Sequence, residues 1–334
     1  MSRPLEQDSR DEAGSPNARV TSVLRRLDPA VMAAFGCIVV LLLLGSLYST
    51  SFLSPEYLLQ QLQVASFLGL IATGMMLVVL MGQIDLSVPW VVTVGGMMST
   101  AAAGWGPMGE AFAIPFGILC GLGLGLVNGI GVAYLRVPSM ILTLGVNAVA
   151  QGLMVVRTGG FAPQDHATDA MHVLATGRIL GIPNALFVWA AVGAVTVFLL
   201  TRTTFGRAVY AIGNRERAAY LSGIPTQRVM MVGFAVSGAL GAFAGALLAG
   251  YSTKAYQSMG DPYLLPAIAA VVLGGTNILG GRGSYMGTVA GVILITLLQS
   301  ILSVMQIDEA GRQVIYGVVI IAMLLIYGRQ RAVS

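Results

Sequence analysis

Charge is scarce in this chain, and its scarcity decides the class of protein. Of the 334 residues, 10% are charged and 56% are hydrophobic, whereas an average soluble domain carries about 25% charged residues. Apolar runs of about 18 residues or more recur along nearly the whole sequence, and within lipid such runs satisfy their backbone groups only as helices. The sequence therefore predicts an all-α, polytopic helical membrane protein.

Cysteine and histidine are almost absent, which argues against disulfide, metal and cofactor chemistry. Cys37 and Cys120 both lie inside apolar runs, where a thiol behaves as a small hydrophobe. His166 and His172 lie in one polar segment without a convincing ligand set or nucleophile–base pair. We therefore expect no disulfide, no metal site and no cofactor, and the two solvated histidines disfavour an intramembrane enzyme.

Two sequence features that would let the chain power transport by itself are also missing. The sequence has no G-x-x-x-x-G-K-[ST] motif, so the chain has no P-loop of its own to bind nucleotide phosphates. The apolar runs hold no ionisable residue of the kind that proton relays use, which argues against a proton-driven carrier. If transport is driven by ATP, a separate subunit must hydrolyse it, and this chain is not itself an enzyme.

Hydropathy predicts a tail followed by about ten membrane spans. Residues 1–30 mix five arginines with five acidic residues and three prolines, which is typical of a disordered cytoplasmic tail. No secretory signal is clear, so we expect the first apolar run to remain as a span. The spans of the transmembrane domain, residues 31–328, are expected at 31–48, 64–81, 88–103, 112–134, 139–157, 184–201, 229–252, 263–281, 286–305 and 312–327.

The basic residues predict which side of the membrane each loop occupies. With the N-terminus in the cytoplasm, fourteen of the 18 Lys and Arg residues fall inside, and those outside are Arg157, Arg178, Lys254 and Arg312. Short cytoplasmic segments carry an excess of Lys and Arg. We therefore expect both termini and the loop 202–228 inside. The polar segment 158–183 and the loops 253–262 and 307–311 are expected outside.

Glycine, by contrast, is abundant at 43 residues. It recurs at every fourth position in the fourth span, and the same spacing returns in the seventh and ninth. The positions are Gly117, Gly121, Gly125 and Gly129, then Gly241 with Gly245, and Gly287 with Gly291. Because small residues let helices approach closely in lipid, we interpret these glycines as packing positions.

Polar side chains form two stripes within the spans. The first consists of Ser139, Thr143, Asn147 and Gln151, whose spacing of four places them on one helix face. The second, in the ninth span, consists of Thr296, Gln299, Ser303 and Gln306, and Asn128 is a further candidate. Their hydroxyl and amide groups can replace water around a neutral polyol. They can equally hydrogen-bond one helix to another. We interpret the stripes as wholes as a substrate pathway.

Asp85 lies between two apolar runs, in the sequence Gly82-Gln83-Ile84-Asp85-Leu86-Ser87, just before Pro89. Asp and Ser commonly cap a starting helix, since their side-chain oxygens accept hydrogen bonds from its free N–H groups. We prefer this capping role to direct contact with substrate.

Four segments, in order along the chain, resemble the permeases of ribose, xylose and galactose-type ABC importers. They are 82–87, with its Ile-Asp-Leu-Ser; 125–129 continuing to 136–138 and 143–145; 206–224; and 272–283. In the third segment, an Ala-Ala pair followed by Ser-Gly-Ile marks the short coupling helix of that family. The similarity runs from about the first span to the last. The chain departs from the family pattern at Gln83, where a second glycine is common, and at Pro89.

The resemblance implies a monosaccharide permease of the inner membrane. It would be a multi-pass protein, surrounded by lipid, that dimerises, docks an ABC ATPase on its cytoplasmic face and receives solute from a periplasmic sugar-binding protein. Nucleic acid is not expected as a partner. The residues implied in coupling to the ATPase are Gly213, Asn214, Glu216, Ala218, Ala219, Ser222 and Gly223; the structural motif is Gly82, Asp85 and Ser87. Which sugar is carried, and whether the second permease is identical or only related, stay open.

Two alternatives remain at this point. A branched-chain amino acid or nucleoside permease shares the architecture, but an amino acid would favour charged or helix-terminal partners, whereas both stripes are uncharged. A secondary carrier or passive channel would need no ATPase, so co-purification with a nucleotide-binding subunit separates it from an importer.

Overall fold

The residues that the structure describes fold into helices with one short hairpin. The computed structural model describes residues 29–48, 50–160 and 165–332, so the expected disordered tail at 1–30 lies outside the described residues except for its last two positions. The helices of the first half are α2 (Pro29–Tyr48), η2 (Thr50–Leu53), α3 (Pro55–Leu80), α4 (Val88–Ala103), α5 (Pro107–Ala133), α6 (Ser139–Thr158) and α7 (Asp169–Thr176). The hairpin pairs β1 (Arg178–Ile179) antiparallel with β2 (Ile182–Pro183). The remaining helices are α8 (Asn184–Arg202), α9 (Thr204–Leu221), α10 (Thr226–Tyr251), η3 (Asp261–Tyr263), α11 (Leu264–Leu273), α12 (Tyr285–Val304) and α13 (Glu309–Ala332).

Several helices are long and apolar enough to cross a membrane. Within the described residues there are six such helices: α3, α5, α6, α8, α10 and α12. Shorter apolar helical stretches lie at Ala34–Leu43, Val88–Ala103 and Asp261–Leu273. The predicted all-α, multi-pass membrane fold is confirmed at this level.

One predicted span, 263–281, is too long. Helix α11 ends at Leu273, and residues 274–284 are not helical. Gly275, Gly280 and Gly281 have φ angles of 87°, 86° and 78°, in the left-handed region that residues with a Cβ rarely adopt. A hydropathy average over the whole predicted span conceals this break, because the strongly apolar residues of α11 outweigh Thr276 and Asn277, which follow them.

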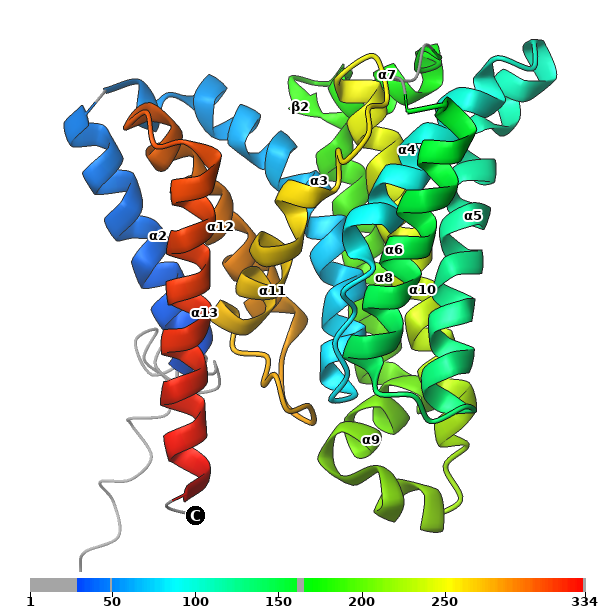
Figure 1. The fold of residues 1–334 in the computed structure, drawn as a ribbon. Coiled ribbons are helices and arrows are strands. Elements are labelled where there is room, and N and C mark those ends of the chain that lie inside the picture. Colours follow the sequence, from blue (N-terminus) through cyan, green and yellow to red (C-terminus); the bar gives the residue numbers. More distant parts are fainter. Residues whose placement is uncertain (1–28, 49, 161–164, 333–334) are drawn as a thin grey trace, which may run out of the picture.

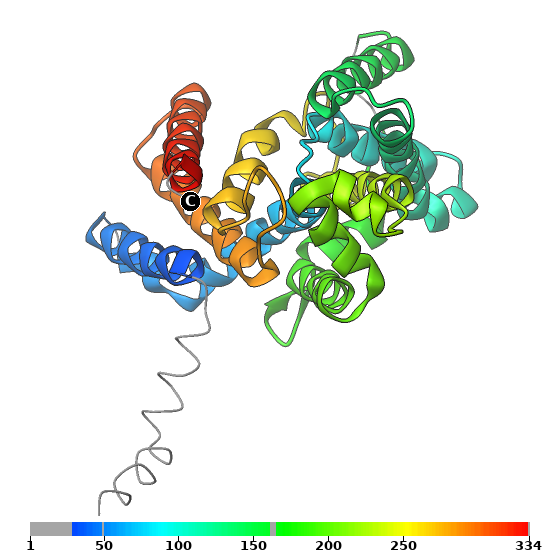
Figure 2. The same ribbon diagram turned by 90° about the horizontal axis from the view of Figure 1, so that it is seen from below.

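The helices form two lobes joined by α3 (Figure 1). In one lobe α10 packs against α4 and α5, and α6 packs against α4 and α5 at the edge. In the other, α12 packs against α2 and α11, and α11 contacts α13. Helix α3 contacts α8 and α10 of the first lobe and α11 and α12 of the second. Seen from below, α6 and α13 lie on one side of the molecule, and α8 on the other (Figure 2).

Glycines mark the closest helix contacts, as the sequence predicts. A Cβ on Gly121 would come 2.5 Å from the carbonyl oxygen of Gly238, and one on Gly129 would come 2.7 Å from Cα of Met231. These contacts join α5 to α10, the most extensive helix pair of the fold. The interpretation of these glycines as packing positions is confirmed.

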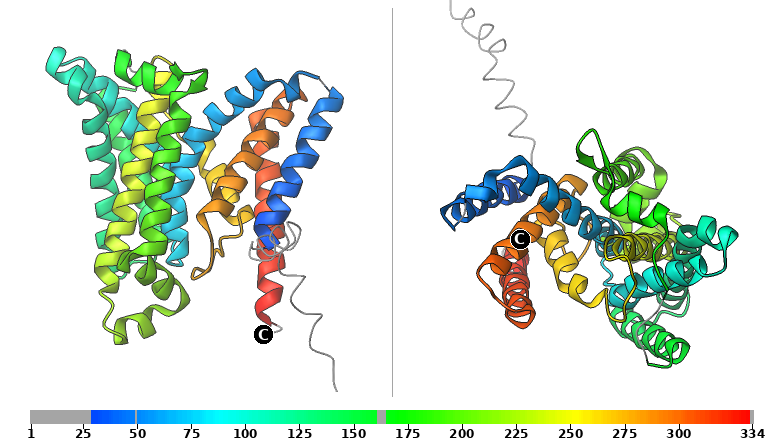
Figure 3. Two further views of the ribbon diagram at one scale, coloured as in Figure 1. Left: turned by 180° about the vertical axis from the view of Figure 1, so that it is seen from behind. Right: turned by 90° about the horizontal axis from the view of Figure 1, so that it is seen from above.

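The two ends of the molecule differ. Helix α9 lies at one end, together with the N-terminal end of α2 and the C-terminal end of α13 (Figure 1). Helix α7 lies at the opposite end, which the view from behind also shows (Figure 3). There the N–H of Ala167 donates to the carbonyl oxygen of Thr253 at 3.0 Å, and His166 pairs with Lys254. Two of the segments predicted on the outside therefore lie side by side.

Candidate functional site

A non-helical segment, residues 82–87, separates α3 from α4. Gly82, with a φ of 74°, turns the chain back at the end of α3. The segment then runs into the interior, where Asp85 is 1% exposed and Ser87 is fully buried. Because these residues form no helix, their backbone N–H groups need partners from elsewhere.

The first polar stripe supplies those partners. Ser139 Oγ accepts from the N–H of Ile84 at 3.3 Å, and Thr143 Oγ1 accepts from the N–H of Leu86 at 2.9 Å. Asn147 Oδ1 accepts from the N–H of Trp90, in the first turn of α4, at 3.3 Å. Gln151, the last member of the stripe, is exposed. The first two side chains of the stripe therefore bind the non-helical segment, and the third binds the first turn of α4.

Asp85 is held in a buried cluster of hydroxyl and amide groups. Its Oδ1 accepts from the N–H and the hydroxyl of Ser87 at 2.9 and 2.6 Å. Ser237 of α10 donates to Oδ2 at 3.4 Å. Asn128 of α5 donates from Nδ2 to Ser87 Oγ at 2.8 Å. No ion pair of Asp85 occurs among the described residues, so three donors from Ser87 and Ser237 satisfy its carboxyl oxygens, and Asn128 supports Ser87 from behind.

The expected capping of α4 differs in detail. Ser87 is the residue before the helix, but its side chain makes no capping hydrogen bond. Asp85 accepts from the N–H of Ser87, which precedes the helix. In the first turn of α4, Asn147 of α6 accepts from the N–H of Trp90. The prediction that Asp85 or Ser87 caps α4 is therefore wrong, because a side chain from another helix occupies that role.

The beginnings of α4 and η3 meet in the interior. Thr93 Oγ1 accepts from the N–H of Gly260, the residue before η3, at 3.1 Å. A Cβ on Gly260 would collide with the carbonyl oxygen of Pro89. Two short helices that start from non-helical segments therefore abut at their N-terminal ends.

Four glycines bring three distant segments together at the α9 end of the fold. We call Gly82, Gly213, Gly280 and Gly281 the glycine junction. A Cβ on Gly280 would lie 2.7 Å from the Gly82 nitrogen and 3.0 Å from Cα of Gly213. The N–H of Gly281 donates to the carbonyl oxygen of Leu80 at 2.9 Å. Three of the four segments that carry the family resemblance therefore touch at one point.

Helix α9 consists of two parts. Its backbone is non-helical at Arg215, with φ −159° and ψ 102°. Tyr210, in the first part, donates its hydroxyl to the carbonyl oxygen of Gly283 at 2.9 Å. Burial raises the pKa of Tyr210 above its ordinary value, so this hydroxyl keeps its proton. The first part of α9 is thus fixed to the segment 274–284.

The second part of α9 projects from the fold. Tyr220 and Leu221 are 63% and 85% exposed. Together with Arg136, Glu216 and Arg217 they line a hollow of about 470 Å³. Arg136 and Glu216 form an ion pair. We call residues 216–223 the α9 tip.

The residues predicted to couple to an ATPase divide between these two parts. Gly213 belongs to the glycine junction, and Asn214 lies against it, with its Oδ1 facing Gly281. Of the residues in the α9 tip, Ala218, Ser222 and Gly223 are exposed, Glu216 is partly buried and Ala219 is buried. Helix α9 ends at Leu221, so Ser222 and Gly223 follow it.

The second polar stripe lies in the other lobe. Thr296 of α12 is buried, and its hydroxyl donates to the carbonyl oxygen of Val292 in its own helix at 2.9 Å. Gln299 is partly buried, and Ser303 and Gln306 are exposed. Because α12 packs against α2, α3 and α11, the two stripes do not face each other within one chain.

Sequence reasoning missed Ser237, Thr93 and Tyr210. Ser237 stands four residues from both Gly233 and Gly241 on α10, and a Cβ on Gly74 would lie 2.8 Å from its Cα. This spacing is the one signal that could have placed it on a packed face. For Thr93 and Tyr210 the sequence carries no comparable signal.

Comparison with known proteins identifies the family. The model of a family described as "Branched-chain amino acid transport system / permease component" matches residues 57–324. A ribose import permease protein of Haemophilus influenzae is 33% identical over 295 residues, covering 87% of this chain and 91% of that protein. One of Bacillus subtilis is 34% identical over 313 residues, covering 93% and 95%.

An autoinducer 2 import system permease protein of Escherichia coli is 30% identical over 305 residues, covering 90% of this chain and 87% of that protein. No solved structure matches the chain significantly. The family match covers most of the chain, and the relatives align over nearly their whole length. The chain therefore belongs to the family of transport-system permease components.

Proposed function

We propose that this chain is the membrane-spanning subunit of an ABC importer that carries a monosaccharide across the inner membrane, with energy from a separate ATPase subunit. The relatives named as ribose import permeases support a sugar as the substrate class. The uncharged character of both polar stripes supports it as well, since a neutral polyol needs donors and acceptors and not a counter-charge.

The exposed α9 tip carries the proposal of a docked ATPase. Tyr220 and Leu221 offer apolar surface, which Arg217 and the Arg136–Glu216 ion pair border with charged groups. An apolar centre with a charged rim is the usual anatomy of a protein interface. The α9 end also carries both described chain ends, and with the basic loop 202–228 this supports a cytoplasmic location for it.

A physical route leads from this surface into the membrane. Movement of the α9 tip would act through Arg215 on the first part of α9, which Gly213 and Tyr210 join to the C-terminal end of α3 at Leu80 and to the segment 274–284. Because close backbone contacts leave no free space, displacement of one segment must displace the others. In our proposal, ATP-driven motion therefore shifts the segment around Asp85 and opens the pathway to alternate sides.

The pathway itself would require a second permease copy or a related permease. The first stripe lies on α6, most of whose residues are exposed, and the second lies on α12 in the other lobe. Exposed apolar residues such as Ile141 and Val156 extend along α6, where they can meet lipid or a partner helix. Pairing two permeases could bring the exposed ends of both stripes, including Gln151 and Ser303, onto one shared pathway.

The opposite end of the molecule would face the periplasm. There the segments 165–183 and 253–262 lie together, and they would receive solute from a periplasmic sugar-binding protein. In this arrangement ten helices of the described chain cross or enter the membrane, namely α2, α3, α4, α5, α6, α8, α10, α11, α12 and α13. Helices α4 and α11 cover part of its thickness, and the segments 82–87 and 274–284 complete their passes.

Transport in proteoliposomes tests the proposal. The purified chain, the ATPase and the binding protein encoded beside it should import radiolabelled ribose or another pentose or hexose only when ATP is inside the vesicles. Liposomes without the permease serve as the control. Uptake without ATP would overturn coupling to an ATPase, and competition by leucine but not by sugars would move the assignment to a branched-chain amino acid, which the family description names.

A further inference from the structure

An apolar groove runs between α8 and α12, across the boundary of the two lobes. Its volume is about 670 Å³, within the range of small-molecule sites. It lies away from the α9 tip and from the first polar stripe. In the view from behind, the two helices that line it, α8 and α12, lie on either side of α3 (Figure 3).

The floor of the groove consists of two buried aromatic rings. Trp189 of α8 is 5% exposed, and its ring packs against Gly69 of α3. Tyr285 of α12 is 7% exposed, and its hydroxyl bonds Thr73 of α3 at 3.1 Å. These contacts fix the rings, so the groove is a built feature of the junction between α3, α8 and α12.

The walls offer hydrocarbon almost throughout. Val197, Val289 and Ile293 face the groove, and Ala190 and Ala194 leave space along α8. Of the polar groups at its edge, the Thr201 hydroxyl is already bonded, since it donates to the carbonyl oxygen of Val197 at 2.7 Å. A sugar would find few hydrogen-bonding partners here, whereas an acyl chain would bury apolar surface.

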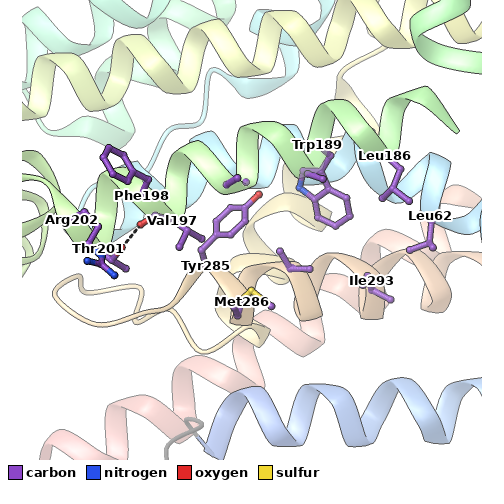
Figure 4. Close-up of a pocket in the computed structure, with 14 residues that line it drawn as sticks. Leu62, Leu186, Trp189, Val197, Phe198, Thr201, Arg202, Tyr285, Met286 and Ile293 are labelled. Atoms are coloured by element: carbon purple, nitrogen blue, oxygen red, sulfur yellow. Dashed lines mark hydrogen bonds between the residues drawn. The ribbon is translucent and has the colours of Figure 1, made fainter. Parts of the chain in front are cut away.

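One end of the groove carries a positive charge. Arg202, the last residue of α8, lies beside Thr201 at the end away from Leu62 and Leu186 (Figure 4). Arg202 is exposed and forms no ion pair with an acidic residue among those that the structure describes. Because α9 follows directly, this guanidinium lies toward the α9 end, which we assign to the cytoplasm. Basic pockets between transmembrane helices on that side bind anionic lipid headgroups.

We propose that the groove binds an anionic phospholipid of the cytoplasmic leaflet, with its phosphate at Arg202 and an acyl chain over Trp189 and Tyr285. A hydrocarbon trough that ends in one unpaired guanidinium complements such a lipid in both shape and charge. The lipid would wedge between the two lobes where α8 and α12 approach. The inference depends on the membrane orientation and not on the transported substrate.

Native mass spectrometry of the full-length protein with added phosphatidylglycerol tests this proposal. We expect one tightly retained lipid in the unaltered chain. Ala194→Phe fills the groove and should abolish retention, whereas Ala191→Phe, at an exposed alanine of the same helix outside the groove, should not. Ala190→Phe gives a second groove-filling variant, and the elution volume of each variant verifies folding. Equal retention by folded Ala194→Phe and Ala191→Phe would overturn the proposal.

The charge is tested separately. Arg202→Gln should lower the preference for phosphatidylglycerol over phosphatidylcholine about fivefold, which corresponds to about 1 kcal/mol for one basic side chain near anionic lipid. Arg207→Gln, at an exposed arginine of α9, should leave it unchanged. An unaltered preference in Arg202→Gln would refute the headgroup assignment. A photo-crosslinker at position 194 should label lipid. Labelling of the N-terminal tail or of a second copy of the chain would show that protein fills the groove, and would refute the lipid proposal.

Discussion

Thr143 accepts a hydrogen bond of 2.9 Å from the backbone N–H of Leu86, a residue 57 positions earlier in the chain. Thr143 is fully buried, and so is the neighbouring Ser87. The bond ties α6 to the non-helical segment 82–87, which has no secondary structure of its own. A side chain predicted to touch substrate thus supports the backbone beside the proposed pathway.

Thr143→Val should destabilise the permease, because it leaves the Leu86 N–H buried without an acceptor. We expect a loss of about 1–2 kcal/mol in the free energy of unfolding, measured by denaturation in detergent, whereas Thr143→Ser should stay close to the unaltered protein. Thr196→Val is the matched control, since that buried hydroxyl bonds only within its own helix. Equal destabilisation by Thr143→Val and Thr196→Val would contradict a special role for the bond to Leu86.

Asp85→Asn should retain folding and most transport. Asparagine keeps an acceptor for Ser87 and can donate to the hydroxyl of Ser237, so each hydrogen bond of the cluster survives. Asp85→Ala removes all of them and should cost about 1–3 kcal/mol for each buried group left unsatisfied. Transport in proteoliposomes and thermal stability are measured on both variants. Loss of transport in a stable Asp85→Asn protein would show instead that the charge contacts substrate or drives a step.

Gly213→Ala should uncouple ATP hydrolysis from transport. The added methyl group would collide with the carbonyl oxygen of Leu80 and the Gly281 nitrogen, and must push the three segments of the glycine junction apart. Coupling changes of about 0.5–2 kcal/mol correspond to roughly 2- to 30-fold less transport for each ATP hydrolysed. Gly145→Ala is the control, because no atom lies within 4 Å of its Cβ position. Unchanged coupling in Gly213→Ala would show that the glycine junction does not transmit motion from the ATPase to the membrane helices.

Tyr220→Ala and Leu221→Ala should weaken binding of the ATPase without lowering stability. Both side chains are exposed, so their removal leaves the fold intact, but truncating an interface anchor costs about 1.4–2 kcal/mol, or roughly ten- to thirtyfold in affinity. Affinity is measured by titrating ATPase onto permease in nanodiscs. Leu180→Ala, at a residue 96% exposed at the opposite end, should leave affinity unchanged. If all three variants bind equally well, the ATPase docks elsewhere.

The sequence predicted helices more reliably than the segments between them. Hydropathy finds α10 and α12 because about 18 apolar residues leave few alternatives in lipid. It extends α11 to 281, because the left-handed φ angles of Gly275, Gly280 and Gly281 leave no mark on a hydropathy average. Backbone conformation at glycine depends on the contacts that surround it, which lie far away in the sequence.

The sequence predicted several residues of the candidate site, but it did not predict which residues they contact. The four-residue spacing correctly places Ser139, Thr143 and Asn147 on one face of α6. Spacing within one helix cannot indicate what that face meets, and here it meets the backbone at 84–90. Likewise, Gly82 and Gly280 are nearly two hundred residues apart, and no local pattern relates them.

The glycine junction sets a rule for building hybrid permeases. Gly82, Gly213 and Gly280 meet backbone to backbone, so each segment is shaped by the absence of side chains on the other two. A chimera that takes only α9 from a relative, in order to accept that relative's ATPase, would contain only one of the three segments that fit together at this contact. The turns around 80–83 and 279–283 must be exchanged with it, so these three short segments should be transferred together although they lie far apart in the chain.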